Sequence, residues 1–155
     1  MALGAFLAIL VLIVVTVLGA LMSFWARRSG IHGLEIWLPL AIILSYAISP
    51  LVGLIVVILI LVGSFFLFPY PLHYLVIMIA CVAGLCFSTL MFPVTAVSFV
   101  KTALYMTIVY NVVSNLIMFI IGHNVVHLFK FALMSTFFSW FIYLKLGWWF
   151  VMLFK

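Results

Sequence analysis

Three histidines have the residue type and the spacing that suit metal or haem binding. His123 and His127 are four residues apart, so a helix that contains both places their imidazoles on one face. His73 begins another predicted helix on the same side of the membrane and can supply a third ligand. Neutral imidazole binds transition metals and haem iron. The acid of an HExxH motif is missing, so we favour histidines at the membrane interface over a haem or transition-metal cofactor; His32 falls on the other side.

A stripe of polar residues marks the fourth predicted helix. The side chains of Thr107, Asn111, Ser114 and Asn115 are three or four residues apart and share one arc. Amides in hydrocarbon are costly unless they are hydrogen-bonded, so this face should meet other helices. The pattern favours hydrogen bonds between helices; the alternative is a substrate or ion path. We expect Glu35, the single acid, at the cytoplasmic edge, and this disfavours a proton-coupled pump.

Lys130 is a further candidate for ligand contact. It follows His127 by three residues, on the same side of the helix. It can contact an anionic lipid headgroup or ligand, although reaching out to the interface is the favoured interpretation. We assign no catalytic residue and do not favour an enzyme, because the sequence has no Asp and no motif of a hydrolase or phosphate-binding loop.

The composition predicts the environment in which these residues act. Apolar residues make up 72% of the 155 residues and charged residues 5%, whereas soluble domains carry roughly 25% charged residues. The apolar runs are long and do not alternate with polar residues, which is typical of helices in lipid. We therefore expect an all-α integral membrane protein in which residues 1–155 form a single polytopic transmembrane domain, without a soluble domain.

Polar breaks and prolines divide the chain into five predicted transmembrane helices. These cover residues 3–25, 36–63, 73–91, 94–121 (or from 102) and 124–143. The tail 145–155, which is rich in tryptophan, is expected at the membrane interface.

Pro50 leaves an alternative open. The apolar stretch from Ile36 to Phe68 has 33 residues, about 50 Å of helix at 1.5 Å per residue. It can form one kinked span, giving five crossings, or a hairpin broken at Pro50, giving six. Five crossings place the N-terminus outside and the C-terminus in the cytoplasm. The positive-inside rule favours that map, because it gathers five basic residues on the cytoplasmic side: Arg27, Arg28, Lys101, Lys145 and Lys155.

Rows of small residues indicate where helices approach each other closely. Such rows allow close packing within the chain or with a partner, and the sequence leaves both open. The rows are Gly19 and Ser23; Ala80, Gly84 and Ser88; and Ser135 and Ser139.

These features favour a small membrane subunit of a larger respiratory, redox or transport complex, in a structural or accessory role. One alternative is an autonomous small-solute transporter or channel that uses the face of Asn111 and Asn115. Another is a haem- or metal-binding protein that uses the three outer histidines. The expected partners are the lipid bilayer and other membrane subunits; the scattered basic residues do not indicate nucleic acid. The plasma membrane of a prokaryote is the default location, with an organelle inner membrane as the alternative.

Overall fold

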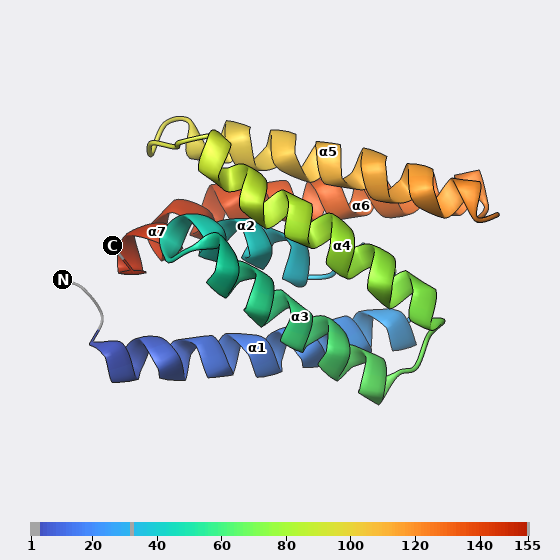
Figure 1. Ribbon diagram of the computed structural model, residues 1–155, viewed down its shortest axis with the longest axis horizontal. Coiled ribbons are helices and arrows are strands. Elements are labelled where there is room, and N and C mark those ends of the chain that lie inside the picture. Colours follow the sequence, from blue (N-terminus) through green and yellow to red (C-terminus); the bar gives the residue numbers. More distant parts are fainter. Residues whose placement is uncertain (1–3, 32, 155) are drawn as a thin grey trace.

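The computed structural model describes residues 4–31 and 33–154, and in these residues the chain is helical without a strand. The predictions for His32 and Lys155 concern residues outside this part. The elements are α1 (Ala5–Arg28), α2 (Trp37–Ala47), α3 (Pro50–Leu67), α4 (Leu72–Ser88), a 3₁₀ turn (Thr89–Met91), α5 (Phe99–Ile120), α6 (Val125–Ile142), a π-helical segment (Tyr143–Gly147) and α7 (Trp148–Phe154) (Figure 1).

Five helical segments of the described chain are long and apolar enough to cross a membrane. The prediction of a multi-pass helical membrane protein is thereby confirmed at the level of its class. The segments are Phe6–Arg28, Pro50–Leu67, Leu72–Met91, Phe99–Ile120 and Val125–Phe154. The shorter apolar helix α2 adds to these five.

The stretch around Pro50 is a helical hairpin, so the favoured single kinked helix was wrong at this point. α2 ends at Ala47, and Ser49 caps α3, its hydroxyl accepting a hydrogen bond from the backbone N–H of Val52 at 3.3 Å. Pro50 occupies the first turn of α3, where a missing N–H breaks no helical bond. The Ser-Pro pair is thus a helix start.

Gly53 lets the two helices of this hairpin touch. A Cβ at Gly53 would lie 2.8 Å from the carbonyl oxygen of Ala41 and 3.0 Å from the backbone nitrogen of Ser45, and would also meet the Ser45 hydroxyl. The backbones of α2 and α3 therefore pack in direct contact, and a side chain at residue 53 would separate them.

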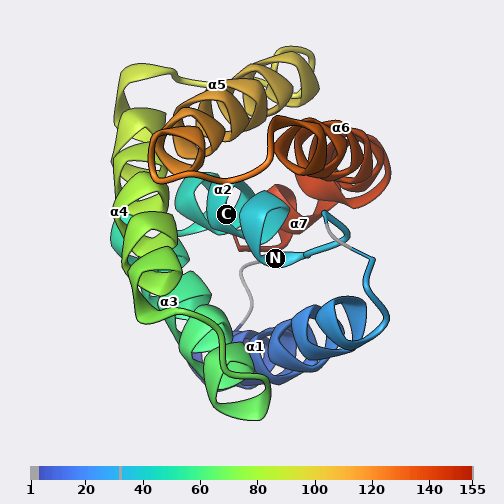
Figure 2. The same ribbon diagram turned by 90° about the vertical axis from the view of Figure 1, so that its right-hand side faces the viewer.

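α2 fills the interior of the protein. Ten of its eleven residues are buried, and Figure 2 shows the longer helices arranged around it. Residues 33–36 lead the chain into α2. Gly33, at φ +93°, lies against the backbone of α6, since a Cβ would be 2.9 Å from the carbonyl oxygen of Phe131. Only glycine combines this conformation with so close an approach.

The helices define two ends of the molecule (Figure 1). We name the Arg27 end after the last turn of α1; the α3–α4 connection and the α5–α6 turn lie there too. The α7 end holds the start of α1, the α2–α3 turn, the α4–α5 connection and α7. Lys101 and Lys145 belong to elements at the α7 end. Arg27 therefore lies at one end of the molecule, and Lys101 and Lys145 belong to the other end. The charge pattern had placed all three on the cytoplasmic side.

The tail contributes to the core. The π-helical segment and α7 continue α6, and α7 packs against α2 with Val151 fully buried. A Cβ at Gly147 would collide with the ring of Phe99, whose ring centroid lies 6.0 Å from that of Tyr143. This end of the molecule is closed by packed aromatic side chains.

The small-residue rows serve different purposes. Gly19 faces Ile60, and a Cβ on Gly63 would lie 3.4 Å from Ala20, so the row on α1 packs against α3. By contrast, a Cβ on Gly84 would meet nothing within 4 Å. The row on α4 borders a groove of about 560 Å³ between α4 and α5.

Gly53 and Gly84 form a matched pair for testing the hairpin. Both are helical, so alanine gives each a similar gain in helix propensity, up to about 1 kcal/mol. In Gly53→Ala the collision with α2 should cost about 1–3 kcal/mol, whereas Gly84→Ala should be neutral or stabilising. Reversible unfolding in mixed micelles measures both; equal stabilities would contradict direct packing of α2 on α3.

Candidate functional site

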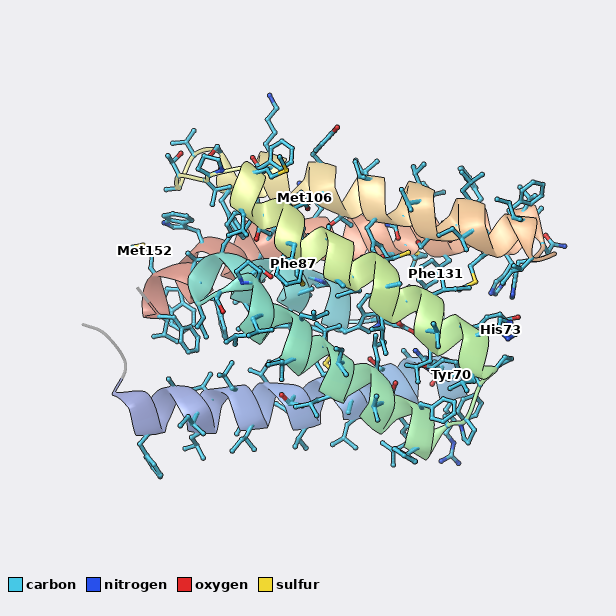
Figure 3. All side chains as sticks on the ribbon, in the orientation of Figure 1. Tyr70, His73, Phe87, Met106, Phe131 and Met152 are labelled. Carbon is cyan, nitrogen blue, oxygen red and sulfur yellow. The ribbon has the colours of Figure 1, made fainter. Side chains whose placement is uncertain are left out.

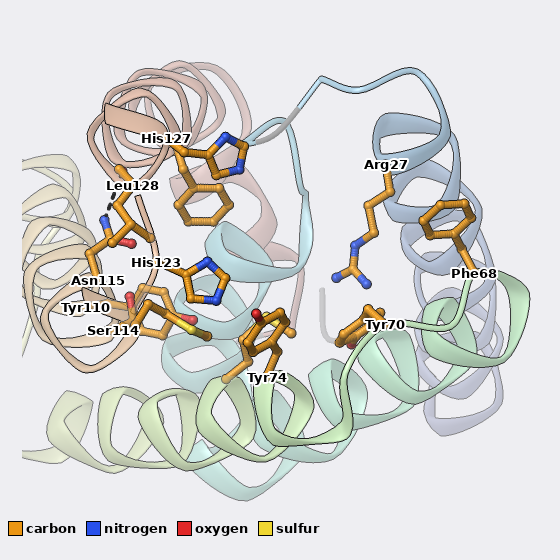
Figure 4. A pocket seen from close by; sticks show the side chains of 13 residues that line it. Arg27, Phe68, Tyr70, Tyr74, Tyr110, Ser114, Asn115, His123, His127 and Leu128 are labelled. Carbon is orange, nitrogen blue, oxygen red and sulfur yellow. Dashed lines mark hydrogen bonds between the residues drawn. The ribbon is translucent and has the colours of Figure 1, made fainter. Parts of the chain in front are cut away.

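A cavity of about 280 Å³ lies at the Arg27 end (Figure 4). Its wall comes from the last turn of α1, the α3–α4 connection, α4, α5, the α5–α6 turn and α6. The polar lining residues are Arg27, Tyr70, Tyr74, Tyr110, Ser114, Asn115, His123 and His127. The apolar lining residues are Phe68, Met78, Met118, Leu128 and Phe131. Segments that are distant in the sequence thus gather hydrogen-bonding groups around one space.

Arg27 and Glu35 form an ion pair beside this cavity. The Nε of Arg27 donates to one oxygen of Glu35 at 3.1 Å, and the exposed fractions of the two side chains are 11% and 8%. The other carboxylate oxygen accepts the indole N–H of Trp37. The guanidinium lies 4.1 Å from the centre of the Tyr70 ring, a cation–π contact. Every charge in this group therefore has a partner.

Glu35 is buried within the protein near the Arg27 end, and its expected place at the cytoplasmic edge of the membrane stays a prediction. The glycine turn at Gly33 carries the chain back into the protein, so Glu35 lies among helices immediately before α2. Acidic residues within membrane proteins commonly pair with basic residues. The single acid of this sequence was therefore a signal of an ion pair.

Aromatic contacts connect the residues that line the cavity to the buried core. The Trp37 ring meets the Tyr110 ring edge to face, with centroids 5.7 Å apart. Tyr110 is 4% exposed and lines the cavity. Closer to the Arg27 end, the ring of Tyr74 lies 4.7 Å from that of His123. The tyrosines thus link α2, α4 and α5 around the same space.

The predicted polar stripe lies on one face of α5 and bonds α5 to α6. The Thr107 hydroxyl shares a hydrogen bond of 2.7 Å with that of Tyr143, and the Asn111 amide donates to Thr136 at 2.9 Å. The amide of Asn115 donates to the carbonyl oxygen of Leu128 at 3.2 Å. These bonds support the interpretation that the pattern favoured.

The stripe is divided between the interface and the cavity. Thr107 and Asn111 are buried between helices, whereas Ser114 and Asn115 line the cavity. The side-chain oxygen of Asn111 has no hydrogen-bond partner among the described residues. Of the four residues proposed for a path, two therefore face a space that a ligand can occupy.

The three candidate histidines are separated. His123 lies in the turn before α6, which begins at Val125, and His127 lies on α6; both line the cavity. His73 is exposed at the start of α4, beside Tyr74, as Figure 3 shows. The part of the chain that the structure describes contains no group of three His, Cys, Asp or Glu placed to hold a metal ion.

Lys130 does not line the cavity. It is the sixth residue of α6 and its side chain is exposed. This position fits a lysine that reaches toward the headgroups. The cavity is lined instead by Arg27, which the charge pattern indicated only as a topology signal.

No family model, curated protein or solved structure matches this chain. The geometry described above is therefore the basis for the functional proposal.

The ion pair predicts a specific cost for removing one charge. Glu35→Ala leaves the guanidinium of Arg27 without its counterion inside the protein, which should destabilise it by about 3 kcal/mol. The double variant Arg27→Gln with Glu35→Gln removes both charges and keeps groups that can hydrogen-bond, so it should retain more stability than Glu35→Ala. Unfolding in micelles gives both values; a Glu35→Ala variant as stable as the parent would show that the pair is not formed.

Proposed function

We propose that this protein binds a small solute in the cavity at the Arg27 end and acts as the solute-binding membrane component of a transport system. The observation that carries the proposal is the convergence of one guanidinium, two imidazoles, an amide and several hydroxyls on a cavity with an apolar remainder. Small-molecule sites commonly combine a mostly apolar wall with a few convergent polar groups.

The packing below the cavity supports binding over open conduction. α2 fills the interior with buried aliphatic side chains, among them Ile42, Ile43 and Leu44. At the α7 end, Phe99, Tyr143 and Trp148 pack together. A solute at the Arg27 end therefore meets a closed interior in this conformation, and passage requires helices to move.

The arrangement of the helices favours a membrane map with both chain ends on the same side. In this map residues 33–36 and α2 together make one passage, giving six in all, in place of the five that the charge pattern favoured. The pair with Glu35 neutralises Arg27, which leaves Arg28 and Lys130 at the Arg27 end. Lys101 and Lys145 belong to the other end, and Lys155 directly follows α7 in the sequence. The positive-inside rule then assigns the α7 end to the cytoplasm and the cavity to the outer face.

The exposure of α1 supports a role within an assembly. α1 packs mainly on α3 and buries a smaller share of its residues than any of the other four long segments. A transport system in which this chain captures solute needs a partner that drives its movement, and α1 offers an apolar surface on which a membrane subunit can pack.

Labelling of single cysteines tests the map. In a Cys81→Ala, Cys86→Ala background, we expect Thr95→Cys and Lys145→Cys to react from the cytoplasmic side and Ser29→Cys from the outer side. All three positions are exposed. A membrane-impermeant maleimide applied to intact cells and to inverted vesicles measures this. Reaction of residues 29 and 95 from the same face would exclude the six-passage map.

Filling the cavity tests the binding proposal. Met118→Trp places an indole in the cavity, whereas the control Leu116→Trp adds the same ring on a 57% exposed position of α5 outside the lining. The parent protein and the control should retain a small molecule through purification, and Met118→Trp should lose most of it. Native mass spectrometry with analysis of the released compound measures this. Equal retention by both variants, or a parent without bound solute, would defeat the proposal.

A further inference from the structure

We propose that the solute is a small organic anion, with one carboxylate or phosphate group on an apolar body, and that its oxyanion binds the outer edge of the Arg27 guanidinium. The inference rests on the proposed function and names the chemical class of the ligand.

The geometry of Arg27 is the first argument. Glu35 takes the Nε side of the guanidinium, at 3.1 Å, and turns its second oxygen to Trp37. The ring of Tyr70 covers one face of the guanidinium. The guanidinium lies at the cavity wall, where Tyr70 also interacts with it (Figure 4), and the parallel N–H groups of its terminal edge match two oxygens of a carboxylate or phosphate.

Other polar groups face the same cavity from the side opposite Arg27. His123 and His127 line it there (Figure 4), and imidazole N–H groups favour a ligand that accepts hydrogen bonds. Arg27, Arg28 and Lys130 outnumber Glu35 among the charges of this end, so its potential favours anions. A cation would face Arg27 across a low-dielectric space while both oxygens of Glu35 are already occupied.

The apolar lining limits the remainder of the ligand. Met78, Met118 and Phe131 also line the cavity. A cavity of about 150 Å³ accommodates benzene, so a volume of about 280 Å³ admits a body of roughly two fused rings. Thioethers adapt to flat apolar groups and make favourable contacts with aromatic rings.

Matched probes test the class. We would measure calorimetric binding of 2-naphthoate, 1-naphthyl phosphate and the uncharged 2-naphthamide to the protein in phosphatidylcholine nanodiscs. The anions should bind at least about tenfold more tightly than the amide, as expected for charge-assisted hydrogen bonds. Equal binding of naphthoate and naphthamide would overturn the inference.

Variants identify the charged residue that distinguishes naphthoate from naphthamide. In Arg27→Gln with Glu35→Gln, no uncompensated charge stays buried, and naphthoate should lose about tenfold or more in affinity while naphthamide keeps its own. Arg28→Gln removes an exposed neighbouring charge that does not line the cavity and should leave naphthoate binding nearly unchanged. A double variant that still prefers naphthoate would show that Arg27 is not the receptor.

The phosphate of a phospholipid headgroup can also supply the oxyanion that binds Arg27. Nanodiscs that contain phosphatidic acid distinguish the sources, because a headgroup in the cavity would block naphthoate and be lost in Met118→Trp. Unimpaired naphthoate binding identifies a free anion, and either result supports the oxyanion site. An uncharged or cationic solute displaced by Met118→Trp would refute the class and leave the binding function intact, whereas naphthoate binding that survives Met118→Trp would refute the cavity itself.

Discussion

The ion pair between Arg27 and Glu35 joins the end of α1 to the start of α2, and the arrangement of the interior depends on it. Charges inside a membrane protein are tolerated when each has a close partner. Here the carboxylate is bonded to the guanidinium on one side and to the indole of Trp37 on the other. The pair thus holds Glu35 inside the protein, where α2 begins. Once there, α2 supplies the apolar core around which the longer helices pack.

The same part of the protein borders the cavity. Tyr110 lines the cavity and packs edge to face on Trp37 in the first turn of α2. The α5–α6 hairpin holds its side of that space through hydrogen bonds at successive turns, from Tyr143 up to Asn115. Such bonds fix the rotation of both helices, and they keep Ser114 and Asn115 directed toward the cavity. Polar residues that act structurally in one half of the stripe therefore position the cavity-lining residues in the other half.

Composition and hydropathy were sufficient to predict the membrane class and most helix boundaries, because long apolar segments have no soluble alternative. The polar face of α5 was also predictable from the spacing of Thr107, Asn111 and Asn115. The hairpin was not, because the positive-inside rule weighed Arg27 as a free charge although it is neutralised by Glu35. That pairing depends on the turn at Gly33 and on contact with α6, a residue separation of about one hundred that no local pattern reports. The grouping of Arg27 with His123 and His127 was hidden for the same reason.

Arg27 belongs at once to the wall of the cavity and to α1, the long helix with the fewest neighbours. In the proposed function, the contribution of Arg27 to the binding free energy of the solute therefore depends on the tilt and rotation of α1. A membrane subunit that binds α1 in one orientation would change the affinity for the solute. By thermodynamic linkage, the solute would change the affinity for that subunit by the same factor. A loosely packed outer helix with a charged last turn can thus couple binding at the lipid-facing surface to binding in the cavity.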